Sequence, residues 1–152
     1  MSRYVIVLAV AAIAVVGVVQ PAVSSTDSKT KKFKRTAIVD SAKNVDNPPS
    51  GDSQGDILVF TQKLFRHSPQ RKKVGTDQVY CVRTIAGEAR VCTGIFFLPR
   101  GTLTITGPES SASVHSLAIT GGTEHWRGAG GEIVLRPQSP LIDRMTFHIE
   151  LG

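Results

Sequence analysis

The stretch that decides the fold is Leu117–Glu132, which reads LAITGGTEHWRGAGGE. A short apolar run leads into Gly121-Gly122, a polar segment follows with the single tryptophan, and three more glycines precede the next apolar run. Glycine adopts positive φ angles and allows close backbone approach without steric cost. A glycine cluster between two strand-like runs therefore predicts a tight corner between two strands and not a flexible linker.

Short runs with strand-like patterning lie on both sides of this corner. In the last of them Met145, Phe147 and Ile149 share one face, and polar residues line the other. About eight such runs occur and no helical period accompanies them, which favours an all-β sandwich or barrel. Eight strands suit a closed, eight-stranded antiparallel barrel with room for a small ligand. Residues 95–98 are apolar on both faces, so the outer wall could pack against other subunits. The expected strands are 36–41, 57–65, 79–85, 91–98, 102–106, 115–120, 132–136 and 141–151.

The N-terminal segment has the features of an export signal. Arg3 precedes a 15-residue apolar run, Val5–Val19, and small residues follow it. We expect residues 1–24 to be a cleaved signal peptide, which makes the protein secreted and without stable membrane association. The alternative is an uncleaved anchor, for which this run is short against the roughly 20 residues that span a bilayer. The remaining chain divides into a polar N-terminal arm, 25–54, and a barrel domain, 55–152.

The chain carries a net charge of +6, part of it in one local run after the signal segment. Basic runs contact nucleic acids or anionic surfaces in some proteins. Here no nucleic-acid-reading motif or interleaved aromatic residue accompanies the run, so we expect a solvated arm and no nucleic-acid partner. An extracellular interaction protein that uses this arm remains an alternative. The run consists of Lys29, Lys31, Lys32, Lys34 and Arg35.

The two cysteines, Cys81 and Cys92, are expected to form a disulfide. If Ala86-Gly87 are the central residues of a hairpin turn, opposed positions sum to 173, as do 81 and 92. The two side chains would then face each other on one side of an antiparallel pair. Free thiols are the alternative.

No metal-ligand spacing, phosphate loop or dinucleotide fingerprint is present, so no metal and no cofactor are expected. The scattered histidines, His115 among them, are expected in solvated or loop positions. Two polar residues are candidates for chemistry. Gln62 shares a face with apolar side chains, and a buried amide needs a partner or a role. Asp40 ends the first expected strand, where apolar walls could raise its pKa and make it a general base. Ordinary hydrogen bonding at a strand end is the alternative for both.

Several segments resemble the allene oxide cyclases and the dirigent proteins. Residues 55–65 (GDILVFTQKLF) are similar to the GDxxxFTxxLY segment of the cyclases. Residues 73–76 with 80–82, 103–108 (LTITGP) and 117–122 (LAITGG) match further cyclase segments, and the corner resembles that of dirigent proteins. The resemblance covers about residues 55–152, and the N-terminal signal and the cysteine pair resemble a secreted bacterial branch of the family.

The resemblance implies an eight-stranded barrel, commonly trimeric, that binds a small hydrophobic molecule and steers a stereoselective cyclisation, an isomerase-like reaction. Gln62 stands where the cyclases have a water-holding asparagine, and Cys81 matches their cavity cysteine. Glu109 replaces a tyrosine, and with Asp40 and Gln62 it completes the candidate catalytic set. A non-catalytic carrier barrel is the alternative, and the homo-oligomer would be a trimer or a dimer. The residues expected to line the substrate site are Leu58, Phe60, Leu64 and Phe147.

Overall fold

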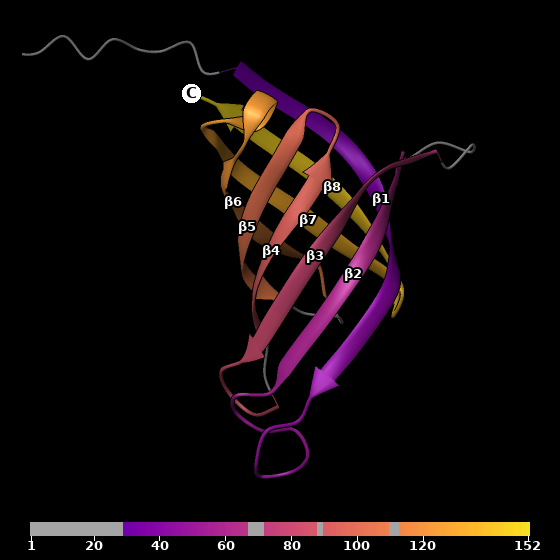
Figure 1. The fold of residues 1–152 in the computed structure, drawn as a ribbon, viewed down its shortest axis with the longest axis vertical. Helices are drawn as coiled ribbons and strands as arrows, with labels where there is room; N and C mark the ends of the chain where they lie inside the picture. Colours follow the sequence, from indigo (N-terminus) through magenta and orange to yellow (C-terminus); the bar gives the residue numbers. More distant parts are fainter. Residues whose placement is uncertain (1–28, 67–71, 88–89, 110–112) are drawn as a thin grey trace, which may run out of the picture.

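The chain forms a closed antiparallel barrel of eight strands in sequence order, as the sequence predicts. A computed structural model describes residues 29–66, 72–87, 90–109 and 113–152 (Figure 1). The elements are β1 (Lys29–Val45), β2 (Ile57–Arg66), β3 (Lys73–Arg83), β4 (Arg90–Leu98), β5 (Gly101–Glu109), β6 (His115–Gly122), the 3-10 helix η1 (Glu124–Trp126), β7 (Ala129–Ser139) and β8 (Ile142–Leu151). β1 pairs with both β2 and β8, and this pairing closes the barrel.

The first strand is much longer than its sequence indicates, with 17 residues instead of the expected six-residue segment 36–41. Residues 29–35 pair with β8 from Lys29↔Leu151 to Arg35↔Met145. The expectation of a solvated basic arm is therefore wrong for this segment. The physical reason is closure: β7 covers one edge of β8, and β1 covers the other edge along its whole length.

The glycine corner connects β6 to β7 through η1, and two glycines show why it needs this residue. A Cβ on Gly122 would lie 2.4 Å from the carbonyl oxygen of Trp126, so the chain approaches itself too closely for a side chain. Gly131 has a φ of +108°, and a Cβ there would lie 2.2 Å from the carbonyl oxygen of His148. The corner is therefore a tight, specifically shaped connection, as predicted.

Aromatic side chains fill the end of the barrel beneath this corner. Trp126 is buried, and its ring centroid lies 6.0 Å from that of Phe33. Phe33 stacks on Phe147 at 4.7 Å, and Phe96 meets Phe147 edge-on at 5.3 Å. These rings belong to one continuous core with Leu64, Leu103 and Ile133. This end of the barrel is therefore a packed core.

The expected signal segment, residues 1–24, lies outside the described residues. Within the described part of the chain, no helix has the length and apolar character needed to cross a membrane.

Candidate small-molecule cavity

A cavity of about 230 Å³ lies in the opposite half of the barrel. We call this end the mouth; it is the end where β1 connects to β2, β3 to β4, β5 to β6 and β7 to β8. Apolar side chains dominate the lining, and polar groups lie among them at a few positions. For scale, an apolar cavity of about 150 Å³ accommodates benzene. The apolar lining includes Val39, Leu58, Phe60, Val79, Phe96, Ile105, Leu117, Leu135 and Met145, and the polar lining includes Gln62, Arg90, Glu109, His115 and Asp143.

Two of the four expected wall residues line the cavity. Leu58 and Phe60 both contribute to it, at the start of β2. Leu64 and Phe147 do not, because they lie further along the barrel, fully buried in the packed core. The period-2 pattern placed all four on the inner face correctly, but inner face and cavity coincide only in the half of the barrel near the mouth.

Gln62 is the polar centre of the cavity, 2% exposed and hydrogen-bonded through both its side chain and its backbone. Its side-chain Nε2 donates to Oδ2 of Asp143 at 3.3 Å. Its backbone N–H donates to Oδ1 of Asp77 at 2.9 Å. The register explains this group, because Gln62 lies opposite Asp77 on β3, while Asp143 on β8 reaches it across β1. Gln62 thus joins two carboxyl groups from distant parts of the chain.

Both carboxyl groups have a raised pKa. Burial raises the pKa of Asp77 to about 8, the hydrogen bond from the Gln62 backbone opposes this, and the charge of Asp143 adds to it. Burial also raises the pKa of Asp143, while the Gln62 side chain and the charge of His115 act in the opposite direction. Asp77 is fully buried, and its Oδ2 has no hydrogen-bond partner among the described residues. A neutral carboxylic acid is the form that tolerates such a position.

His115 supplies a second titratable group to the cavity, contrary to the expectation of a solvated or loop histidine. Its Nδ1 lies 2.9 Å from the carbonyl oxygen of Ser113, so Nδ1 carries the proton in the neutral ring. Nε2 is then the atom with the lone pair. It is buried and has no hydrogen-bond partner among the residues described. The cavity therefore combines a carboxyl group with a raised pKa and an imidazole nitrogen that can accept a proton.

Asp40 does not lie in the cavity, which corrects the expectation drawn from its position at the end of a strand. It is the extra residue of a β-bulge, between the pairs Val39↔Gln62 and Ser41↔Thr61. Its carboxylate is half-exposed and lies 2.5 Å from the ammonium group of Lys63. The neighbouring side chain, Val39, takes the inward position instead. Asp40 is thus an outward-facing acid in a surface ion pair.

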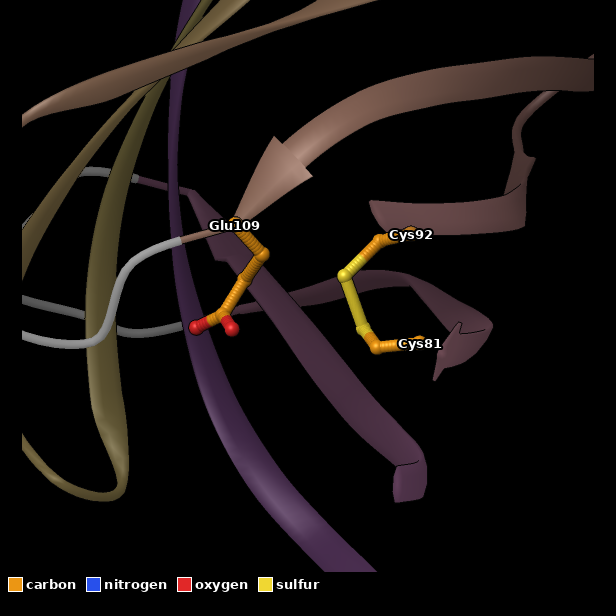
Figure 2. A group of neighbouring side chains, drawn as sticks. All are labelled: Cys81, Cys92 and Glu109. Carbon is orange, nitrogen blue, oxygen red and sulfur yellow. A yellow bond between two sulfur atoms is a disulfide. The ribbon is translucent and has the colours of Figure 1, made fainter. Parts of the chain in front are cut away.

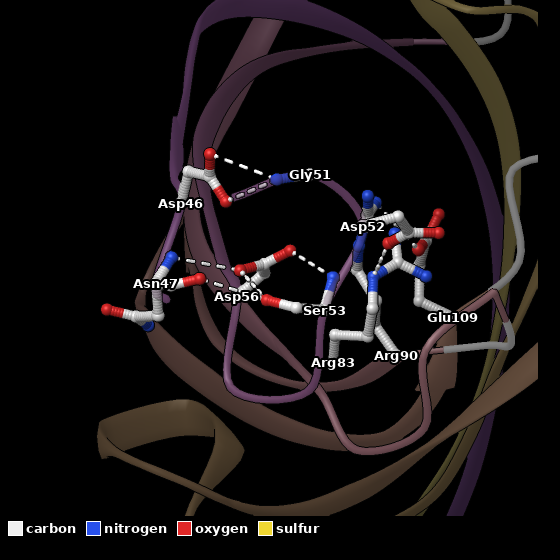
Figure 3. Close-up of polar contacts among 9 residues, drawn as sticks. All are labelled: Asp46, Asn47, Gly51, Asp52, Ser53, Asp56, Arg83, Arg90 and Glu109. Atoms are coloured by element: carbon white, nitrogen blue, oxygen red, sulfur yellow. Dashed lines mark hydrogen bonds and ion pairs between the residues drawn. The ribbon is translucent and has the colours of Figure 1, made fainter. Parts of the chain in front are cut away.

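Glu109 lines the cavity as expected, near the mouth. One of its oxygens lies 3.9 Å from Nη1 of Arg90, which also lines the cavity. Figure 3 shows this pair next to the β1–β2 loop, where Asp52 forms an ion pair with Arg83. The mouth is therefore rimmed by charged groups of both signs.

The β1–β2 loop is fixed in place by Asp56. Its Oδ1 accepts from the backbone N–H of Asn47 at 3.0 Å, and its Oδ2 accepts from the backbone N–H of Ser53 at 2.8 Å (Figure 3). The Ser53 hydroxyl also donates to Oδ1. The backbone hydrogen bonds, that from Ser53 first, lower the pKa of Asp56. The loop thus presents a defined rim at the mouth.

The disulfide between Cys81 and Cys92 is confirmed. The two cysteines pair across β3 and β4, as predicted from opposed positions whose residue numbers sum to 173. β3 ends at Arg83, two residues before the expected end, and β4 begins at Arg90, so the connection is longer than a two-residue turn. Glu109 lies beside the bridge, and its ligand atom and the two sulfurs lie within 4.8 Å of one another (Figure 2). Bridged sulfurs offer no thiolate to a metal, so this group is no metal site. For the same reason Cys81 has no thiol role here.

Sequence reasoning missed three charged or titratable groups that line the cavity, Arg90, His115 and Asp143, and also Asp77, which lies behind Gln62. Asp77 and Asp143 come from β3 and β8, outside the segments that carry motifs, and His115 begins β6. The alternation along β3 places Asp77 on the same face as Val79 and Cys81, and this was the one available signal. A charged residue on an apolar strand face marks a buried polar site.

Comparison with solved structures identifies the fold. The pyocyanin demethylase matches with a TM-score of 0.68 and 22% identity, over 78% of this chain and 99% of that one. The pterocarpan synthase dirigent protein GePTS1 matches with a TM-score of 0.61 and 22% identity, over 83% of this chain and 86% of that one. The Diels-Alderase AbmU from Streptomyces koyangensis matches with a TM-score of 0.64 and 16% identity, over 84% of this chain and 71% of that one.

At these identities the matches establish the fold. No protein-family model matches the sequence, and no curated protein does. The structural matches agree with the eight-stranded closed topology and with the segments that resemble cyclases and dirigent proteins. The chain therefore has the allene oxide cyclase/dirigent-like barrel fold.

Proposed function

We propose that this protein binds a small, largely apolar molecule in the barrel cavity and steers its stereoselective cyclisation, an isomerase-like reaction. The observation that carries the proposal is the apolar cavity of about 230 Å³ with the Gln62–Asp143 pair inside it. The named activities of two structural neighbours, a pterocarpan synthase and a Diels-Alderase, support ring formation as the reaction type. Neither name specifies a substrate for this chain.

The cavity would contribute confinement and a proton. Confinement selects one folded conformation of a flexible substrate before the ring closes. The Gln62 hydrogen bond occupies Oδ2 of Asp143, which leaves Oδ1 as the atom that would carry the proton. That proton can be donated to a substrate oxygen as charge develops there, and the same carboxyl group recovers it when the ring has formed. No atom is gained or lost, as an isomerisation requires.

His115 would act as the proton acceptor, whereas Asp143 would act as the proton donor. Its Nε2 lies at the same cavity, where it can accept a proton from a substrate hydroxyl or carbon acid and return that proton to the product after ring closure. Asp77 lies behind Gln62 and fixes the backbone there, so it is a positioning residue. Glu109 and Arg90 lie at the mouth, where they would contact the part of the substrate that enters last.

The assembly and location of the protein are part of the proposal. The outer face of β2, β3 and β4 exposes a contiguous set of large apolar side chains, which supports a homo-oligomer. The disulfide supports an oxidising, extracytoplasmic location, in agreement with cleavage of residues 1–24. Native mass spectrometry of the exported protein measures the oligomeric mass, the N-terminus and any retained ligand together. The exposed set is Val59, Tyr80, Val91, Ile95 and Phe97.

Asp143→Asn tests the catalytic part of the proposal. The substitution keeps the size of the side chain and removes the transferable proton. With an allylic epoxide of a fatty acid or a phenolic quinone methide as substrate, we expect turnover to fall by about 10²-fold or more while ligand affinity stays within about threefold. Asp40→Asn is the matched control, because Asp40 lies outside the cavity, and its turnover should equal that of the wild type. Unchanged turnover in Asp143→Asn removes Asp143 from the mechanism, and tight binding without turnover in the wild type favours the carrier alternative.

A further inference from the structure

The basic run at the start of the described chain divides into two sets because β1 is a strand. Lys31 and Arg35 turn toward the aromatic end of the barrel. The ammonium group of Lys31 lies 5.3 Å from the centre of the Trp126 ring, and the guanidinium of Arg35 lies 4.3 Å from that of Phe33. Lys32 and Lys34 alternate with them and remain exposed on the outer face. The run is therefore two lysines on an outer wall and not a uniform charged arm.

The closure of the barrel brings further cations next to these two lysines. Lys34 pairs with Thr146 on β8, and the next row on that face places Arg144 of β8 beside Arg136 of β7. Lys32 lies opposite His148. β1, β8 and β7 are consecutive strands of the wall (Figure 1). We call the resulting hollow, of about 420 Å³, the basic groove; it is lined by Lys32, Lys34, Arg35, Val134, Arg136, Arg144, Met145, Thr146 and His148.

Acidic side chains do not neutralise the basic groove. The ion pairs among the described residues join Lys63 to Asp40, Arg83 to Asp52 and Arg90 to Glu109, and none includes Lys32, Lys34, Arg136 or Arg144. Glu132, which pairs with His148, and Glu150 border one end of the groove but do not line it. Four like charges concentrated on one face produce a local potential that attracts anions.

The spacing and surroundings of these cations indicate the kind of anion. Neighbouring strands lie about 4.8 Å apart, and alternate residues on one strand lie about 6.7 Å apart. Cations at these spacings can each contact one anionic group of a polymer whose anionic groups repeat every few ångströms along the chain. The large exposed apolar side chains of the described residues do not include any that line the groove, so it offers no stacking platform for bases and no group for insertion into a bilayer.

We infer that the basic groove binds a linear polyanion with closely spaced phosphate or sulfate groups. Lys34, Arg136 and Arg144 form the centre of the site, and Lys32 extends it along β1. The hydroxyl of Thr146 lies between Lys34 and Val134 in the register and can donate to an anionic oxygen. The site is on the outer wall, so it operates independently of the cavity and would place the barrel on an anionic polymer while the cavity stays accessible.

The test uses the full-length mature protein and inorganic polyphosphate as the probe. The triple variant Lys34→Gln, Arg136→Gln and Arg144→Gln is compared with Lys43→Gln, Lys72→Gln and Lys73→Gln, which removes the same charge from exposed positions outside the groove. At about fivefold per cation, we expect the groove variant to lose on the order of 100-fold in affinity, with a shallower dependence of log K on log salt. The control variant should stay within about threefold of the wild type.

Three results would overturn the inference. The first is equal weakening in both triple variants, which would mean that only net charge matters. The second is a wild-type protein that does not bind polyphosphate at 50 mM salt, on the order of the low-salt condition at which such contacts are strongest. The third is tighter binding to phosphatidylglycerol vesicles than to polyphosphate, which would assign the groove to a lipid surface. Because all six substituted side chains are exposed, circular dichroism and thermal melting should show folded protein in both variants.

Discussion

Replacing Asp77 by asparagine should change how the stability of the barrel depends on pH. Asp77 is fully buried, and the pKa of its carboxyl group in the folded protein is about 8, against an ordinary value of 3.8. Between these two values the folded state binds a proton that the unfolded state does not. The contribution of Asp77 to the free energy of unfolding must therefore fall as the pH rises from about 4 to about 8.

The size of this contribution follows from the two pKa values. Each pH unit in that interval lowers the free energy of unfolding by about 1.4 kcal/mol, and about three units separate 3.8 from pH 7. The carboxyl group of Asp77 therefore lowers stability by about 4 kcal/mol between acidic solution and neutral pH. Asparagine does not ionise, and its Oδ1 can still accept the N–H of Gln62.

Urea unfolding at pH 4, 5.5 and 7, without reductant, measures this effect. The difference between the free energies of unfolding of Asp77→Asn and the wild type should grow in favour of the variant by about 4 kcal/mol from pH 4 to pH 7. Carboxyl groups that do not interact with Asp77 are present in both proteins, and their contributions cancel in the difference. Asp40→Asn serves as the control, because that carboxylate is half-exposed, and its difference should vary by less than about 1 kcal/mol. A difference for Asp77→Asn that is constant with pH would refute the reasoning.

Two further predictions concern the corner and the disulfide. Gly131→Ala should destabilise the barrel by more than about 1 kcal/mol, because its φ is +108° and the added Cβ would meet the carbonyl oxygen of His148. Gly130→Ala should be near neutral, since a Cβ there meets nothing within 4 Å; equal melting temperatures for the two variants would contradict this account. Replacing both Cys81 and Cys92 by alanine should cost about 3 kcal/mol, because the bridge closes a loop with a sequence separation of 11. A urea midpoint equal to that of the oxidised wild type would show that the bridge does not contribute to stability.

Local patterns in the sequence were enough to predict the main features of the fold. The alternation in β8 placed Met145, Phe147 and Ile149 inside, because side chains of a strand point to opposite faces in turn. The glycine spacing located the β6–β7 corner, because few residues other than glycine tolerate those backbone positions. A presumed turn between Cys81 and Cys92 predicts that the two residues pair across β3 and β4. The structure confirms this pairing, although the connection is longer than the presumed turn. These features depend on residues close to one another in the chain.

The closure of the barrel decided which side chains distant in sequence come into contact. Gln62 contacts Asp143, 81 positions away, because the β1–β8 pairing brings the two ends of the barrel domain together. Asp40 faces outward at a bulge, whose presence depends on the pairing of β1 with β2. Lys34 and Arg136 share one groove only because β8 lies between their strands. The sequence by itself therefore determined the number and order of the strands, the corner and the disulfide. The length of β1, the cavity chemistry and the basic groove arise from contacts between strands distant in sequence, which no local pattern encodes.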